Sequence, residues 1–181
     1  MAKQKTRFKW FTVPEWEKEE IWLREQHKKG WRLVKATAPG IYKFEQCESQ
    51  DVIYQLDYNE EGMNHLGEYI QMFHDCGWEY VTAMVGYAYF RKPATEMVED
   101  EGIFCDDASR MDMIERVYNG KMKPLIVIFC CCVVPQLFLH NSGVMGKGIY
   151  LLFVAVFILY LSIFVKFAYQ YWKVKNRKEK R

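Results

Sequence analysis

The sequence predicts an α+β domain over residues 1–93, followed by a transmembrane helical hairpin over residues 121–172. Two observations predict this organisation. A short stretch of the N-terminal half recurs later in the same half, and two long apolar runs occupy the C-terminal third. A basic tail over residues 173–181 closes the chain.

The repeated stretch predicts a duplicated structural unit. Residues 27–36 (HKKGWRLVKA) and 74–83 (HDCGWEYVTA) share His, Gly, Trp, Val and Ala at equivalent positions. In each copy an amphipathic helical pattern precedes the glycine, which suits a helix end because glycine accepts a positive φ. A strand is expected to start immediately at the following tryptophan.

Each copy is expected to contain a strand, a helix and two further strands. Pro14 suits the first turn of the first helix. In the first copy the elements are expected at 8–12, 16–27, 31–36 and 40–44. In the second they are expected at 52–58, 66–77, 78–83 and 86–90. Two β-α-β-β units most naturally form one antiparallel sheet with two helices on one face, in a ferredoxin-like or related fold.

The other face of this sheet is the candidate binding face, because the domain holds more aromatic side chains than one face can bury. Such a face suits a protein partner or a small apolar ligand. The alternative is that the linker helix or a second subunit covers it as ordinary core. The candidate face consists of Trp10, Trp31, Tyr42, Tyr54, Trp78, Tyr80 and Tyr89.

Residues 94–120 carry two basic and eight acidic groups and are expected to form an acidic linker. It ends in a juxtamembrane amphipathic helix that Gly120 is expected to cap. This segment is interpreted as lying on the bilayer or on the domain. The alternative is a docking peptide for a partner.

The apolar runs cover Leu125–Leu139 and Ile149–Val165, and the second continues to Trp172. Each approaches the ~20 residues that a membrane span needs. Basic residues flank both ends of the pair, whereas residues 140–148 carry only Lys147, so both termini are predicted to be cytoplasmic in a multi-pass cell-membrane protein. The alternative is a pair of buried helices in a soluble core.

Several chemistries are not indicated. The α+β domain is nearly neutral, with 13 basic and 14 acidic groups in residues 1–93, which argues against nucleic-acid binding. The six cysteines form no C-x-x-C pair, so neither a disulfide framework nor a zinc finger is predicted. The triplet Cys130–Cys132 suits helix packing, with acylation as the alternative.

His27 and His74 occupy equivalent repeat positions near Cys47 and Cys76, and they invite a metal interpretation. Histidine near a helix C-terminus is also favoured by the helix dipole, so no metal and no cofactor are predicted. The acidic residues 15–20 are expected to stabilise a helix N-terminus rather than to form a general-acid pair. No catalytic motif is present, and we predict that the protein is not an enzyme.

Five stretches together resemble a bacterial family called domain of unknown function 2812. The resemblance covers about residues 7–93 and implies a membrane protein whose domain is followed by a hairpin, often encoded beside a PadR-like transcriptional regulator. It supplies no established catalytic residues. The matching stretches are 17–23 (EKEEIWL), 30–31 (GW), 52–58 (VIYQLDY), 77–81 (GWEYV) and 89–93 (YFRKP).

We therefore expect a membrane-anchored cytoplasmic binding or sensing module with a regulatory role and no catalytic activity. Its expected partners are the lipid bilayer and a protein or small apolar ligand, with homo-oligomerisation left open. The alternative is a subunit of a small oligomeric transporter or channel, since two helices alone cannot enclose a pore.

Overall fold

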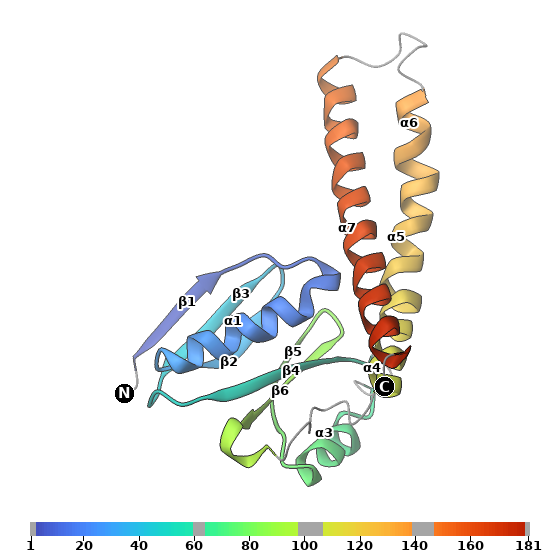
Figure 1. The fold of residues 1–181 in the computed structure, drawn as a ribbon. Helices are drawn as coiled ribbons and strands as arrows, with labels where there is room; N and C mark the ends of the chain where they lie inside the picture. The colour runs from blue at the N-terminus through green and yellow to red at the C-terminus, as the bar shows by residue number, and fades with distance from the viewer. Residues whose placement is uncertain (1–2, 60–63, 98–106, 139–146, 180–181) are drawn as a thin grey trace. The chain divides into compact units, whose positions relative to one another are not determined.

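The computed structural model describes residues 3–59, 64–97, 107–138 and 147–179. It divides into two compact units, Met1–Met113 and Ile114–Arg181, which are described separately (Figure 1). The first combines strands with helices, which confirms the predicted mixed α+β class. Residues 98–106 of the predicted acidic linker and residues 140–146 of the loop between the apolar runs lie outside the described residues.

The first unit contains two antiparallel sheets of three strands each. Sheet A has the order β1-β3-β2 and sheet B has the order β4-β6-β5, so both place their third strand in the middle. Sheet A consists of β1 (Gln4–Phe8), β2 (Trp31–Thr37) and β3 (Ile41–Gln46). Sheet B consists of β4 (Val52–Tyr58), β5 (Glu79–Met84) and β6 (Tyr87–Pro93).

The structure therefore has two sheets where the sequence predicted one. Strands β2 and β5 lie close together, and each contains a register shift, after Leu33 and after Tyr80. Side chains from sheet B satisfy the backbone at the β2 shift: the Leu33 N–H donates to the Tyr54 hydroxyl, and Arg91 donates to the Leu33 carbonyl oxygen, both at 3.3 Å. A continuous hydrogen-bond ladder between β2 and β5 would need free backbone groups on β2, and here the Leu33 N–H and carbonyl oxygen are bound by side chains instead.

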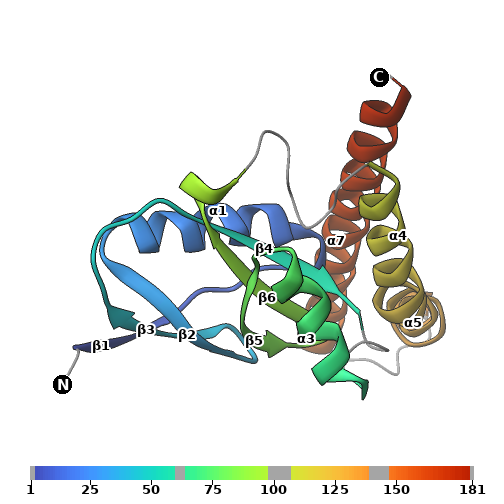
Figure 2. The ribbon, with the colours of Figure 1, turned by 90° about the horizontal axis from the view of Figure 1, so that it is seen from below.

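Helix α1 (Trp16–Lys28) packs against both sheets, as the views in Figures 1 and 2 show. The Trp22 ring centroid lies 4.9 Å from that of Tyr42 and 5.7 Å from that of Phe44, both on sheet A. On its other side, His27 Nδ1 lies 2.8 Å from the Tyr54 hydroxyl on sheet B. The helix is thus shared by the two sheets rather than lying on a free face of one.

The chain enters α1 through a short 3₁₀ turn, Val13–Glu15, that contains Pro14 at the expected position. The Glu15 carboxylate accepts hydrogen bonds from the Thr12 N–H at 3.0 Å and from the Thr12 hydroxyl at 2.5 Å. This capping contact fixes residues 12–15 in a turn. The predicted strand 8–12 is therefore wrong in position, because β1 ends at Phe8 and the chain then turns toward the helix.

Both helix-ending glycines are confirmed. Gly30 follows α1 and Gly77 follows α3 (Leu66–Asp75), and both have a φ of +78°. The Gly77 N–H donates to the His74 carbonyl oxygen and the Trp78 N–H donates to that of Phe73, which is the hydrogen-bond pattern of a Schellman cap. The sequence identified these positions because no other residue type adopts this conformation as readily.

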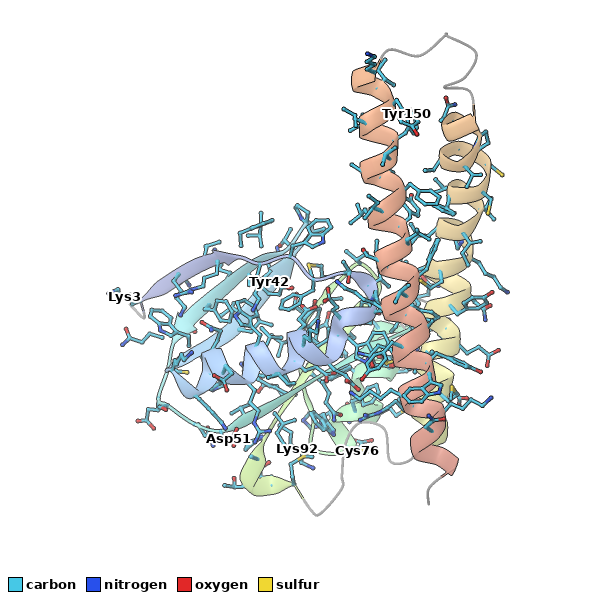
Figure 3. The ribbon with its side chains drawn as sticks, turned by 45° about the horizontal axis from the view of Figure 1, so that its top comes forward. Lys3, Tyr42, Asp51, Cys76, Lys92 and Tyr150 are labelled. Carbon is cyan, nitrogen blue, oxygen red and sulfur yellow. The ribbon has the colours of Figure 1, made fainter. Side chains whose placement is uncertain are left out.

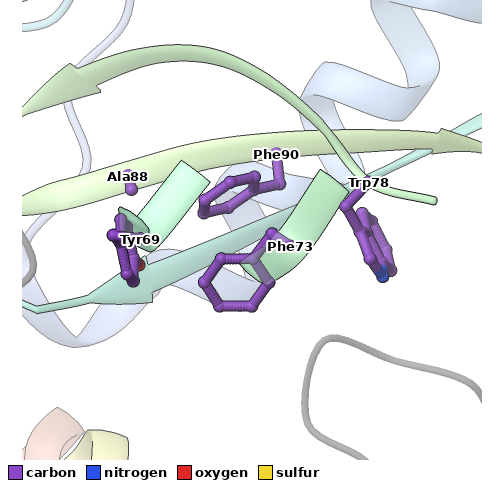
Figure 4. Packing of buried hydrophobic residues seen from close by; sticks show 5 residues of the cluster. All are labelled: Tyr69, Phe73, Trp78, Ala88 and Phe90. Atoms are coloured by element: carbon purple, nitrogen blue, oxygen red, sulfur yellow. The ribbon is translucent and has the colours of Figure 1, made fainter. Parts of the chain in front are cut away.

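Helix α3 packs on the face of sheet B that points away from α1. Its side chains form a buried cluster with strand residues, and the Phe73 and Phe90 ring centroids lie 4.3 Å apart (Figure 4). Lys92 donates to the Cys76 carbonyl oxygen at 3.1 Å and so caps the end of α3 (Figure 3). The cluster consists of Tyr69, Phe73, Trp78, Ala88 and Phe90.

The second unit is a pair of antiparallel helical stretches. Two helices are long and apolar enough to cross a membrane, Arg110–Gln136 and Lys147–Asn176, with lengths of 27 and 30 residues. The Phe129 ring packs between them, with centroid distances of 5.2 Å to Phe157 and 5.4 Å to Phe164. The second stretch belongs to helix α7 (Lys147–Glu179).

The first stretch continues through Gly120, so the predicted helix end at this glycine is wrong. It runs through helices α4 (Asp107–Val117), α5 (Lys123–Ile128) and α6 (Val134–Phe138). The π-helical segments Tyr118–Met122 and Phe129–Val133 connect them, and each lies two residues before a proline, Pro124 or Pro135. Proline cannot donate to the carbonyl four residues earlier and clashes with it, and a widened turn accommodates that loss without ending the helix.

Candidate functional site

The polar interior of the first unit is organised by Glu19 on α1. Its carboxylate oxygen Oε1 accepts hydrogen bonds from the Tyr42 hydroxyl of sheet A at 2.6 Å and from the Tyr89 hydroxyl of sheet B at 2.5 Å. Glu19 is only 6 % exposed. Burial raises the pKa of Glu19, although the two hydroxyl donors act in the opposite direction. One side chain therefore connects the helix to both sheets.

The neighbouring Glu20 binds the free edge of β4. Its Oε1 accepts the Leu56 N–H at 2.8 Å, which satisfies a backbone donor that an edge strand otherwise leaves exposed. Burial raises the pKa of Glu20 to about 8, with the Leu56 hydrogen bond opposing the shift. Near neutral pH this carboxyl group holds a proton more readily in the folded than in the unfolded chain.

Replacing Glu20 by glutamine is expected to reduce the pH dependence of stability. Between the unfolded pKa of 4.5 and the folded value of about 8, the folded state binds more protons, so the free energy of unfolding falls as pH rises. From pH 6.5 to 8.5 the wild type should lose about 1–2 kcal/mol that Glu20→Gln retains. Unfolding of the full chain in detergent at the two pH values measures the difference.

The comparison starts at pH 6.5 because His27 changes the stability below that pH. Its pKa is 6.5 in the unfolded chain and about 4 in the folded chain, so between these values the free energy of unfolding rises with pH. Glu25→Gln is the matched control, since Glu25 lies on the same helix with its side chain 56 % exposed. An equal pH response in Glu20→Gln and the wild type would contradict the assignment of the proton to Glu20.

A pocket of about 220 Å³ lies beside the C-terminal end of α1, between the two sheets. Both sheets and the segment between β3 and β4 contribute to its wall, and most of the lining side chains are charged or polar. The lining consists of His27, Arg32, Cys47, Glu48, Gln50, Val52, Glu79, Arg91 and Pro93.

His27 lines this pocket as a neutral imidazole. Burial, together with the positive charges of Arg91 and Arg32, lowers the pKa of His27 to about 4. Its Nδ1 forms a 2.8 Å hydrogen bond with the Tyr54 hydroxyl, which also accepts the Leu33 N–H. The ring is therefore held in place by a hydrogen bond that occupies one of its two nitrogens.

Two guanidinium groups face the same space, and each binds a glutamate on its own sheet. Arg91 donates from Nε to Glu79 at 2.7 Å, and Arg32 donates from Nε to Glu45 at 3.0 Å. The Arg91 hydrogen bonds lower the pKa of Glu79. The wall of the pocket therefore combines a fixed neutral imidazole with two guanidinium groups that are each bound to a glutamate.

The structure distributes the seven residues of the predicted aromatic face among different places. Tyr42, Tyr54 and Tyr89 are buried against α1, and Trp78 is buried in the α3 cluster. Tyr80 packs beside that cluster, and Trp31 is half-buried beneath Lys5, whose Nζ lies 4.0 Å from the ring centroid. Trp10 is 62 % exposed. The seven side chains therefore do not share one exposed face.

The other sequence candidates are also placed. His27 and Cys47 line the pocket together, whereas His74 and Cys76 lie at the end of α3, away from its lining. Among residues 3–59, 64–97, 107–138 and 147–179, no group of three or more His, Cys, Asp or Glu side chains is arranged to hold a metal ion. Sequence reasoning missed Arg91 and the buried roles of Glu19 and Glu20. Helical spacing from Trp16, Leu23 and His27 would have placed Glu19 on the buried face of α1, with the half-buried Glu20 at its margin.

Comparison with known proteins gives one match. The family model described as "Protein of unknown function (DUF2812)" matches residues 15–130, from the start of α1 into the first candidate membrane span. No curated protein and no solved structure matches the chain.

Proposed function

This chain belongs to the DUF2812 family of proteins of unknown function, and we propose that it is a membrane-anchored module inside the cell that binds a small polar ligand and acts without catalysis. The observation that carries the proposal is the pocket of about 220 Å³ with His27, Arg32 and Arg91 in its wall. The two guanidinium groups in its wall favour a ligand with a carboxylate or phosphate group over the apolar ligand expected from the sequence.

The membrane part of the proposal rests on the two apolar helices and their basic flanks. The family match runs from residue 15 in the α+β unit to residue 130 within the first of these helices, which supports a function that needs both. Both termini are proposed to be cytoplasmic because the basic residues concentrate before the first span and after the second. A regulatory role, in which ligand occupancy changes how the domain contacts a protein partner, fits this arrangement.

A ligand screen on the purified full chain in detergent tests the binding proposal. Small carboxylates, phosphates and zwitterions are added one at a time, and the midpoint of thermal unfolding is measured. A ligand at 100 times its Kd stabilises the folded state by ~2.7 kcal/mol, which is a measurable increase in the midpoint. We expect at least one of these anionic classes to raise it.

Arg32→Gln is expected to abolish that increase, because it removes a guanidinium from the pocket wall. Arg24→Gln is the matched control: Arg24 also binds an acid, Asp51 at 2.6 Å, and lies outside the lining. A screen without any increase, or an equal increase in both variants, would refute the pocket as the binding site. A reporter fused after Arg181 tests the topology separately and is expected to be cytoplasmic.

A further inference from the structure

The face of sheet A opposite α1, here called the outer face, differs from the inner face in composition. Inner side chains such as Leu33, Tyr42 and Phe44 are buried. Strand register places the alternating side chains in rows across the outer face: Phe8 pairs with Ile41 and Ile41 with Thr37, and Thr6 pairs with Lys43 and Lys43 with Lys35. These six residues are all exposed; Thr6 and Phe8 lie on β1, and the other four lie on β2 or β3.

An apolar tip lies at one end of the outer face. Phe8 is 67 % exposed and Ile41 is 42 % exposed, and they are direct cross-strand partners. Trp10 follows two residues after Phe8, and the turn before Ile41 holds it close, since the Lys9 N–H donates to the Gly40 carbonyl oxygen at 2.9 Å. Three large apolar side chains with this exposure at one edge of a domain indicate a contact surface.

The charge around this tip has one sign. Residues 3–10 and the strands β2 and β3 contain seven basic residues and one acidic residue, Glu45. Glu45 is engaged by Arg32. Residues 1–93 as a whole carry 13 basic and 14 acidic groups, so sheet A concentrates positive charge that the rest of the domain balances. Lys35 and Lys43 lie directly beside the tip, in the next row of the outer face.

We propose that the outer face of sheet A docks on an anionic lipid surface, with Phe8, Trp10 and Ile41 entering the interface and Lys35 and Lys43 contacting the headgroups. Tryptophan and phenylalanine favour the membrane–water interface, and lysine favours anionic headgroups within a Debye length. A nucleic acid would also attract the lysines, but Phe8 and Ile41 form an apolar pair without a hydrogen-bonding group to read bases. A domain tethered to a bilayer also meets lipid at a high effective concentration.

Fluorescence quenching on the full chain in vesicles tests this proposal. The chain is reconstituted into vesicles of zwitterionic lipid alone or with added phosphatidylglycerol, each containing acyl-brominated lipid as the quencher. The Trp10 contribution is the difference between the wild type and Trp10→Phe. We expect strong quenching of this contribution in the anionic vesicles and weaker quenching in the zwitterionic ones.

Charge reversal is expected to remove the difference. Each basic residue near an anionic surface changes the docking equilibrium by roughly fivefold, so Lys35→Glu with Lys43→Glu should weaken docking on the order of a hundredfold. Lys18→Glu is the matched control, because Lys18 is an exposed lysine on α1 and does not belong to the outer face of sheet A. Trp31→Phe is a second control. Trp31 lies beneath Lys5, so its replacement should leave the lipid-dependent quenching unchanged and assign that signal to the tip.

Equal quenching in both lipid compositions, or unchanged quenching in the double charge reversal, would overturn the proposal. Binding of a fluorescent oligonucleotide by the detergent-purified chain, lost in the double reversal and without lipid quenching, would assign the face to nucleic acid and also overturn it. An unchanged thermal midpoint in the variants shows that the exposed substitutions leave the fold intact, so a loss of quenching then reports docking.

Discussion

Replacing Glu19 by alanine is expected to destabilise the α+β unit by about 3–5 kcal/mol. The substitution removes the acceptor of the Tyr42 and Tyr89 hydroxyls, which are both buried. Each buried donor left without a partner costs about 1–3 kcal/mol, and the vacated side-chain volume adds to this loss. Chemical or thermal unfolding of the full chain in detergent measures the change.

Two further variants serve as comparisons for Glu19→Ala. Glu19→Gln keeps a carbonyl oxygen at the same place without a charge to desolvate, so it should cost much less than the alanine variant. Glu25→Ala removes an exposed carboxylate from the same helix, and its effect should stay within about 0.5 kcal/mol. A loss in Glu19→Ala no larger than that in Glu25→Ala would show that the shared hydrogen bonds do not hold the sheets and helix together.

Replacing Gly40 by alanine is the second change with a large expected effect. Gly40 has a φ of +118°, and a Cβ built there lies 2.4 Å from the Lys9 carbonyl oxygen. The neighbouring atom belongs to the backbone, so relief requires β1 to move away from the β2–β3 turn. Left-handed strain of about 1–3 kcal/mol adds to this steric conflict, and we expect a total loss of at least about 3 kcal/mol.

Gly67 provides the opposite expectation. It is the second residue of α3, and nothing approaches within 4 Å of a Cβ built on it. Alanine has the higher helix propensity, so Gly67→Ala should stabilise the chain by about 0.5–1 kcal/mol. A comparable loss in both alanine variants would indicate a general sensitivity of the domain rather than the close approach at Gly40.

The repeat in the sequence predicted the local elements better than their assembly. Gly30 and Gly77 end their helices as expected, because a positive φ is a property of the residue itself. The predicted single sheet is replaced by two sheets. At β2 the Leu33 backbone binds the side chains of Tyr54 and Arg91, which are distant from Leu33 in sequence, so no local pattern predicts this choice over a backbone ladder. Hydrophobic patterns identify buried faces but do not identify which element covers them.

The candidate site shows the same limit. The aromatic content indicates more side chains than one sheet face can bury, yet sequence alone does not separate Tyr54, which is buried under α1, from Trp10, which is exposed. The sequence places Glu19 and Glu20 at the start of a helix, where the helix dipole stabilises acidic residues. The hydroxyl groups that bind Glu19 come from β3 and β6, and no local pattern reveals them.

The position of α1 between the two sheets has a consequence for synthesis of the chain. On the ribosome, α1 and sheet A are complete before β4 and β6 exist, so Glu19 has Tyr42 but lacks Tyr89, and Glu20 lacks Leu56. At ~5–20 residues per second this state lasts for a few seconds. The nascent N-terminal half is therefore expected to stay sensitive to protease until β6 has emerged, and then to become resistant in a single step.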